Sequence, residues 1–538
     1  MQVYLKPNIV IEPLFDQWYA WPHLISPATS AMNVANRHIK IMKSFVKAPQ
    51  MHAAAVKNVK MKGGPFMDIS VDSAGDVKEL LEGTIAKREY QLAFCEALKE
   101  LDDLLKKHPK GYSLDELYSQ VPDILKGYVE LVYDLNNNLS YRFFEPLLYR
   151  SDLYDETAQS IAIWETNNDE RPFVLSTPRL KNEEDVLHFN IPFADPVIDE
   201  LAKMKREPRD LNYIKKLLDV QPEHEALFES FFTIDEPVRY EPYTGDKVRM
   251  RYFGHASILV ETKDISILID PVISYYGYQT EVGRFSDIDL PDVIDYVLIT
   301  HNHQDHILFE TLLPLRHKIK NLVVPASTSS SLQDPNLKLM FNNIGFDNVH
   351  EIQDLQSINF ADCTITGIPF IGEHSDLNIQ SKVCHHVKLG EFSMLFVADS
   401  CNMESQLYKH VQAFTGDIDI IFLGMECDGA PLSWLYGPLL TDELEREKDQ
   451  SRRLAGSNFE RGKALMEVFN PKELYVYAMG MEPWLEFISS IKYTDESRPI
   501  IESNKLVEYC HSKGITAERL FGEKELYYSK KKHEYEVV

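Results

Sequence analysis

The sequence has 538 residues, more than a single hydrophobic core usually serves, so two domains are expected. Hydrophobic residues make up 44% and charged residues 26%, as in an ordinary globular protein. The net charge of −27 argues against general nucleic-acid binding, and no apolar stretch in the sequence is long enough to span a bilayer. Because no secretory signal is recognisable and the six cysteines are scattered without a C-x-x-C pair, we expect a reduced, cytoplasmic protein.

Two short lysine clusters are candidates for local contact with an acidic partner. One comprises Lys57, Lys60 and Lys62, and the other comprises Lys530, Lys531 and Lys532. A solvated face or a loose tail is the commoner explanation of such clusters.

Residues 1–245 are patterned mainly as helix. Apolar residues at helical spacing predict one helix over 77–107. Ser113 and Glu116 have capping-box spacing and predict the start of another helix, which Pro122 should interrupt before the pattern resumes to Leu135. Extended segments are predicted at 160–164 and 172–176, and helices at 196–203 and 211–220. No concentrated chemical motif occurs here, so we predict an α+β domain for dimerisation, partner recognition or support of the second domain.

The pattern changes after residues 235–246, where prolines and a glycine punctuate a polar stretch. Strands are predicted at 248–260, 265–269, 296–300, 322–324, 363–368, 394–398, 418–423 and 474–477. Helices are predicted between several of them, one starting at Ser457 with a capping-box Glu460. Strands that alternate with helices predict a layered α/β domain over residues 246–538.

The segment after the strand at 296–300 is the most informative part of the sequence. His301, His303, Asp305 and His306 follow within six residues in the order H-x-H-x-D-H. Such a loop can surround metal ions, and imidazole with carboxylate suits zinc, iron or manganese. Four ligand-type residues at this spacing are rarely accidental.

This motif resembles the metallo-β-lactamase superfamily, and the resemblance implies further site residues. Asp399, at the end of a strand, fits the bridging aspartate, and His255 and Asp270 would orient ligands. Another ligand is expected at Glu373 or His374; adjacent residues of an extended chain point opposite ways, so only one should face the metals. The segment 474–481 lacks the final histidine of the hydrolases, and His511 and His533 are unsuited to replace it.

The whole pattern resembles the CmlA-type diiron β-hydroxylases of chloramphenicol biosynthesis. The resemblance rests on the H-x-H-x-D-H loop, Gly372-Glu373-His374, Asp399 and the run 424–438. It implies a metallo-β-lactamase αββα sandwich preceded by the mainly helical domain. It also implies that His301, His303 and Glu373 hold one iron, that Asp305 and His306 hold the other, and that Asp399 bridges them. The sequence shows no departure at these six positions.

The resemblance implies an O2-dependent monooxygenase that hydroxylates the β-carbon of an aminoacyl group on a nonribosomal peptide synthetase carrier domain. Its irons would cycle between Fe2+ and Fe3+ with electrons from a separate reductase, and Glu373 and Asp399 would be its catalytic carboxylates. A homodimer is expected. Met425, Glu426, Trp434 and Tyr436 would lie near the substrate pocket, with core packing favoured for Met425 and left open for Glu426. The alternative is a zinc-dependent lactonase or thioesterase. It needs His374 as a ligand, and the absence of a final histidine from this sequence counts against it.

Overall fold

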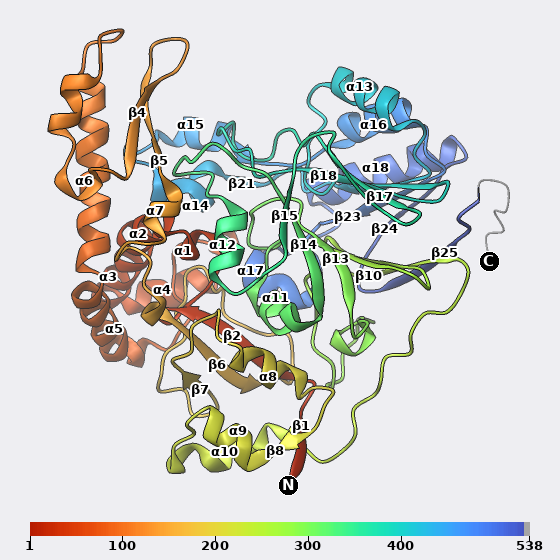
Figure 1. Ribbon diagram of the computed structural model, residues 1–538, viewed down its shortest axis with the longest axis horizontal. Coiled ribbons are helices and arrows are strands. Elements are labelled where there is room, and N and C mark those ends of the chain that lie inside the picture. Colours follow the sequence, from red (N-terminus) through yellow and green to blue (C-terminus); the bar gives the residue numbers. More distant parts are fainter. Residues whose placement is uncertain (532–538) are drawn as a thin grey trace.

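Two facing seven-stranded sheets form the second half of the chain (Figure 1). The computed structural model describes residues 1–531, so Lys532 and His533 lie outside the described residues. The first sheet has the order β15-β14-β13-β12-β11-β10-β25. Its strands are β10 (Val248–Gly254), β11 (Ser257–Glu261), β12 (Ser266–Ile269), β13 (Ile294–Leu298), β14 (Ile319–Pro325), β15 (Val349–Ile352) and β25 (Lys524–Tyr528).

The second sheet has the order β16-β17-β18-β19-β20-β23-β24. Its strands are β16 (Ser357–Phe360), β17 (Cys363–Ile368), β18 (Cys384–Leu389), β19 (Phe392–Phe396), β20 (Ile420–Gly424), β23 (Glu473–Tyr477) and β24 (Thr516–Arg519). β19, β20, β23 and β24 run parallel to one another, as do β12 to β15 in the first sheet. The central strands are buried on both faces, which explains their nearly continuous apolar sequences.

Helices cover the outer faces of both sheets. α13 (Ser405–Thr415), α16 (Phe459–Phe469) and α18 (Arg498–Ser512) share a buried cluster with the second sheet. α11 (Phe309–Leu315) and α12 (Leu337–Asn343) pack on the first. The result is the four-layered αββα sandwich that the family resemblance implies.

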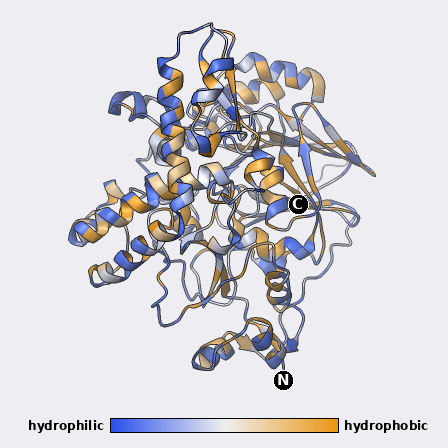
Figure 2. Cartoon of the chain, turned by 60° about the vertical axis from the view of Figure 1, so that its left-hand side comes forward, coloured by the Kyte–Doolittle hydropathy of each residue, from blue (hydrophilic) through white to orange (hydrophobic). Residues whose placement is uncertain are grey.

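The first half of the chain combines helices with a small sheet of order β3-β2-β6-β7. Its strands are β2 (Ile9–Phe15), β3 (Trp18–Tyr19), β6 (Gln159–Glu165) and β7 (Leu187–Phe189). The helices include α2 (Pro27–Asn33), α3 (Ile39–Lys47), α4 (Pro49–Val56), α5 (Ala74–Lys87), α6 (Glu89–Lys107), α8 (Val197–Lys203), α9 (Leu211–Leu217) and α10 (Glu225–Ser230). Figure 2 shows the peripheral helices banded in blue and orange, as expected of amphipathic helices that bury one face.

One hydrophobic cluster crosses the predicted boundary between the two domains. It runs from β2 and α2 through the outer face of the first sheet to α11 and α12. The predicted boundary at 245/246 falls in a stretch without helix or strand between β9 (Phe232–Thr233) and β10. Of the residues described, no helix is both long and apolar enough to cross a membrane.

The helix predicted over 77–107 is two helices, α5 and α6, that meet at Arg88. Arg88 has φ −107° and ψ 24°, which ends α5. Its buried guanidinium contacts the carboxylates of Asp16 and Asp155. The apolar spacing continues across the break, so periodicity alone could not reveal it.

The helix predicted after Ser113 is wrong. Residues Asp115–Gln120 form only a 3-10 helix, and the segment that follows is a hairpin of β4 (Val129–Tyr133) and β5 (Leu139–Phe143). Valine and tyrosine in β4 favour a strand, and the asparagine-rich turn supports the hairpin. The segment 172–176 also lacks a strand. Near Ser457 the helix is confirmed, but its N-cap is Asn458, whose side chain accepts from Arg461 N.

Candidate metal centre

The predicted ligands lie where neighbouring parallel strands end. In the first sheet, Asp270 follows β12 and the 301–306 loop follows β13. In the second sheet, Asp399 follows β19. Because parallel neighbours present their carboxyl ends at one edge, the topology brings these side chains together.

Asp270 and Thr300 fix the orientation of the histidines. Asp270 Oδ1 accepts from Thr300 N at 2.8 Å and Oδ2 accepts from Thr300 Oγ1 at 2.6 Å. Asp270 Oδ2 also lies 2.8 Å from His306 Nδ1. A proton on Nδ1 leaves the lone pair of His306 Nε2 facing Asp399, whose Oδ2 is 3.2 Å away.

Among the described residues, three groups of potential donor atoms gather at this edge, each within 4.8 Å. They are His301, His303, Glu373 and His374; His255, Asp305 and His306; and His301, His306 and Asp399. The third group takes one histidine from each of the others. Asp399 therefore lies between two clusters, where a bridging ligand would lie. All six predicted ligands are brought together.

Buried polar atoms without a hydrogen-bond partner mark the same place. They include His255 Nε2, His301 Nε2, Glu373 Oε2, His374 Nε2 and Asp399 Oδ1. Glu373 Oε2 lies 3.2 Å from His303 Nδ1 without a hydrogen bond, as donor atoms that face a common ion do. Burial raises the pKa of Glu373 to about 7, so its carboxylate is costly without a cation. Three imidazoles and three carboxylates without a thiolate fit two ions such as iron, manganese or zinc.

The expectation that only Glu373 or His374 can face the metals is wrong. Both belong to the first group of donors because the backbone here is not extended. Gly372 has φ 82° and Glu373 has φ 67°. A Cβ on Gly372 would lie 2.7 Å from Cys401 Cβ, so this turn requires glycine. His374 Nδ1 lies 3.2 Å from the Gly372 carbonyl and is placed to donate to it, which leaves His374 Nε2 with a lone pair.

His255 is placed to orient Asp305, as the sequence analysis expects. Gly480 N donates to His255 Nδ1 at 3.1 Å, so a neutral His255 carries its proton on Nε2. That nitrogen lies 3.5 Å from Asp305 Oδ2. Burial alone would raise the pKa of Asp305, but the nearby His255 side chain and the charge of His306 hold this pKa well below its usual value.

The segment that lacks the final histidine ends beside the candidate ligands. β23 ends at Tyr477, and Ala478, Met479 and Gly480 line the cavity beside the donors. His511 lies on α18 and approaches the Ala517 carbonyl instead, at 2.9 Å. Positive φ at Ala478, as at His255 and Glu373, concentrates backbone strain around this site.

The donors open into a cavity of about 560 Å³. Trp434 and Glu426 line it, as the sequence analysis expects, whereas Met425 is packed in the core. Tyr436 Oη lies 3.0 Å from His303 Nε2, so it supports a ligand. Sequence reasoning missed the wall formed by Ile491, Lys492, Tyr493 and Arg498, because no motif marks it. Lys60 and Lys62 also line this cavity.

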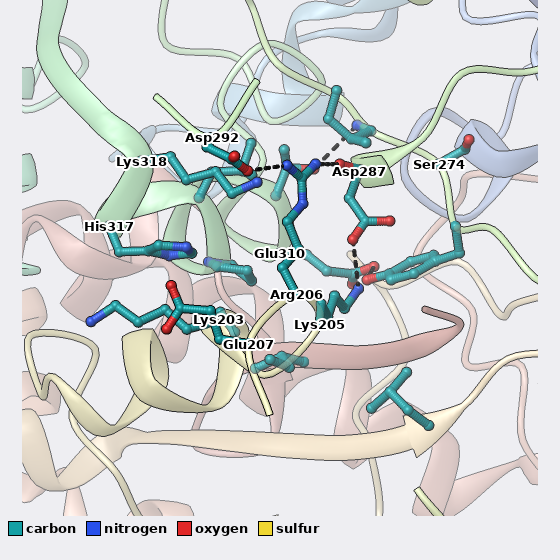
Figure 3. Close-up of a pocket in the computed structure, with 18 residues that line it drawn as sticks. Lys203, Lys205, Arg206, Glu207, Ser274, Asp287, Asp292, Glu310, His317 and Lys318 are labelled. Carbon is teal, nitrogen blue, oxygen red and sulfur yellow. Dashed lines mark hydrogen bonds and ion pairs between the residues drawn. The ribbon is translucent and has the colours of Figure 1, made fainter. Parts of the chain in front are cut away.

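A separate cavity of about 230 Å³ lies between β2, the end of α8 and α11 (Figure 3). Lys205, Arg206 and Lys318 line it, and Arg206 donates to the Asp292 carboxylate at 2.5 Å. No donor of the metal cluster lines this cavity. The chemistry therefore belongs to the larger cavity.

Comparisons with known proteins identify the family. The N-terminal domain of the diiron non-heme beta-hydroxylases matches residues 4–237, and a beta-lactamase superfamily domain matches residues 266–429. A relative from Streptomyces venezuelae, 4-amino-L-phenylalanyl-(CmlP-peptidyl-carrier-protein) 3-hydroxylase, is 38% identical over 527 residues, which cover 97% of this chain and 98% of that protein. The chain belongs to the diiron non-heme β-hydroxylase family.

The diiron β-hydroxylase fold extends over nearly the whole chain. The crystal structure of CmlA, a diiron beta-hydroxylase from Streptomyces venezuelae, matches with a TM-score of 0.92 and 39% identity, covering 98% of this chain and 99% of that one. A metal-dependent hydrolase of Flavobacterium johnsoniae is 28% identical over only 148 residues, 24% of this chain and 60% of that protein. The predicted family, fold class and hydroxylase activity are confirmed, and the hydrolase alternative is weaker.

Proposed function

We propose that this diiron hydroxylase uses O2 to hydroxylate the β-carbon of an aminoacyl group held as a thioester on a nonribosomal peptide synthetase carrier domain. The observation that carries the proposal is the similarity over 97% of the chain to a relative named for an aminoacyl substrate on a peptidyl carrier protein. The retained set of six candidate ligands supports it.

In this proposal His301, His303 and Glu373 would hold one iron, and Asp305 and His306 would hold the other. Asp399 would bridge the two irons, which its position between the two donor groups supports. Glu373 and Asp399 are the catalytic carboxylates. Burial and the neighbouring imidazoles hold the pKa of His301 well below its usual value, so this ring is neutral, the form that binds a metal.

The bound irons supply the oxidising power, and the chain supplies geometry and a shaped cavity. One oxygen atom of O2 enters the C–H bond and the other leaves as water, with two electrons and two protons from an external reductase. Asp270, His255 and Tyr436 hold ligands in place. Trp434 and Ile491 are walls of the cavity that limit water around the reacting carbon.

The carrier docks beside Lys60 and Lys62 in this proposal. Lys60 lies within the short 3-10 helix Val59–Met61 and Lys62 directly follows it, and both line the cavity. Val59 is 75% and Met61 39% exposed, so apolar and basic groups lie together there. Such a patch suits an acidic carrier domain even though the net charge of −27 provides no long-range attraction. Homodimer formation through the N-terminal half remains part of the proposal.

Single-turnover assays test this function. Diferrous protein is mixed with O2 and either an aminoacyl-carrier or the same free amino acid, and the product is analysed by mass spectrometry with 18O2. We expect one 18O atom on the β-carbon of the carrier-bound group and little reaction of the free amino acid. Equal hydroxylation of both would overturn the carrier requirement.

Metal analysis tests the diiron assignment. We expect about two irons per chain after growth with iron, because the six ligands divide into two sites. Stoichiometric zinc with no oxygenation after iron reconstitution would favour the hydrolase, in which His374 is a ligand.

A further inference from the structure

Glu426 is a carboxylate in the wall of the metal-site cavity that the candidate ligand set does not use. It follows β20 by two residues and lines the cavity with Asp399. None of the donor groups described above includes it. Its position therefore offers negative charge to a ligand in the cavity.

Both oxygens of the Glu426 carboxylate are held by the protein. Tyr493 Oη donates to Oε1 at 2.9 Å, and Gly429 N donates to Oε2 at 2.5 Å. A carboxylate oxygen has two lone pairs, so each can accept another hydrogen bond. The carboxylate is fixed in direction before any ligand arrives.

No cation within the described chain forms an ion pair with Glu426. The neighbouring carboxylates make its negative charge still less favourable without a cation. Burial raises its pKa to about 7, and the charges of Asp428 and Asp399 act in the same direction. Lys62 and Lys492 pair with Glu486 instead. A carboxylate in this setting favours a ligand that brings its own positive charge.

The aminoacyl thioester of the proposed function brings such a charge. Its α-ammonium is separated from the reacting β-carbon by a single carbon atom. Glu426 is close to Asp399, the proposed bridging residue, because a Cβ added to Gly456 would lie 3.3 Å from the Glu426 carbonyl oxygen and 3.6 Å from the Asp399 carbonyl oxygen. Both residues line the same cavity. A group that holds the ammonium at Glu426 therefore also fixes the β-carbon relative to the metals.

We propose that Glu426, held by Tyr493, accepts the α-ammonium of the carrier-bound aminoacyl group and so selects aminoacyl over simple acyl substrates. This inference rests on the proposed function and adds a specificity-determining residue to it. Asp428 also lines the cavity and is not a candidate metal ligand, but it is exposed and its charge is screened by water.

The experiment compares two carriers, one loaded with an aryl amino acid and one with the arylpropionyl group that lacks the amine. Wild type, Glu426→Gln and Glu426→Asp are loaded with iron, and their iron content and optical spectra are matched. If the ammonium forms a charge-assisted hydrogen bond with Glu426, Glu426→Gln should lower the second-order rate constant of the single turnover by about 10- to 100-fold for the aminoacyl carrier. The arylpropionyl carrier should change by less than about 3-fold, and Glu426→Asp should recover part of the preference.

Tyr493→Phe should lower the preference for the aminoacyl carrier by a smaller factor. It removes the hydrogen bond from Tyr493 to Glu426 but leaves the negative charge of Glu426 in place. An equal loss on both carriers would overturn the proposal, because it would mean that Glu426 only supports the cavity. An unchanged preference in Glu426→Gln would also overturn it.

A binding measurement separates this inference from the proposed function. Calorimetry compares aminoacyl-pantetheine with acyl-pantetheine on iron-loaded protein without O2. A preference for the amine that depends on Glu426 supports the inference even if no hydroxylation occurs, in which case only the proposed reaction fails. If the protein neither prefers the amine nor hydroxylates the aminoacyl carrier, both the inference about Glu426 and the proposed function would be overturned.

Discussion

Asp270 Oδ2 lies 2.8 Å from His306 Nδ1, and both side chains are completely buried. The contact directs the other nitrogen of His306 toward Asp399. A carboxylate behind a metal-binding imidazole fixes its tautomer and increases its basicity.

Asp270→Asn should therefore lower iron affinity by about 10- to 100-fold while the fold persists. The amide can offer its NH2 group to Nδ1 and favour the wrong tautomer. Iron retained during dialysis against a chelator gives the measurement, and circular dichroism checks the fold. Asp362→Asn, at an exposed ion pair with Lys530, is the control and should leave iron content unchanged. Equal retention in both variants would contradict the role of Asp270.

Glu373→Ala should lower iron content more than His374→Ala. The carboxylate oxygen of Glu373 lies 3.2 Å from His303 Nδ1 and 4.0 Å from His301 Nε2, so it faces the same point as the two histidines. Elemental analysis after identical iron reconstitution measures the difference. The opposite ranking would make His374 the ligand and favour hydrolase chemistry.

Arg171→Leu should destabilise the whole protein by about 3–5 kcal/mol, because it leaves carboxylates buried without their partner. Arg171 donates two hydrogen bonds of 2.9 Å to Glu310 and one of 3.1 Å to Glu12. These side chains are at most 6% exposed. Denaturant unfolding gives the free energy.

The matched control for Arg171→Leu is Arg142→Leu, whose partner is Glu130 and whose side chain is 53% exposed. We expect a loss below about 1 kcal/mol for this exposed pair. Arg171 and Glu12 belong to the first half of the chain and Glu310 to the second. Similar losses in the two variants would contradict a special contribution of this buried network to stability.

Lys318→Met should stabilise the protein most at pH values below 7. Burial lowers the pKa of Lys318 to about 7, whereas in the unfolded chain it is about 10.4. Between these values the unfolded chain binds the extra proton, so the stability of the wild type rises with pH. The advantage of Lys318→Met, on the order of 2–4 kcal/mol at pH 6, should shrink toward pH 10. Unfolding free energies across this range measure it, and a constant difference would contradict it.

The loop that holds the candidate metal ligands could be predicted because these residues lie close together in the sequence. Four ligand-type residues follow one apolar strand, and the strand's end places them all at one edge of the sheet. The Glu373 and His374 pair could not be resolved because its geometry depends on positive φ values. Those in turn depend on contacts with Cys401, which is distant in sequence.

The N-terminal half was less predictable because its hydrophobic patterns fit either a helix or a strand. Residues 123–135 have apolar spacing that fits a helix, yet Val129–Tyr133 forms a strand in a hairpin. Strand β2 was missed, since all seven of its residues are buried and alternation is absent. Tyr493 and Glu426 meet across 67 residues, and no sequence pattern records such a contact.

The hydrophobic cluster shared by the two halves has a consequence for biosynthesis. Trp21 and Ile11 in the first half are buried in the same cluster as Phe309 and Phe341, which are synthesised about three hundred residues later. The emerging N-terminal half must therefore present apolar surface until the first sheet forms, a state prone to aggregation. We expect chaperones to engage it during translation, and we expect the yield of folded enzyme to depend on how quickly the ribosome reaches α12.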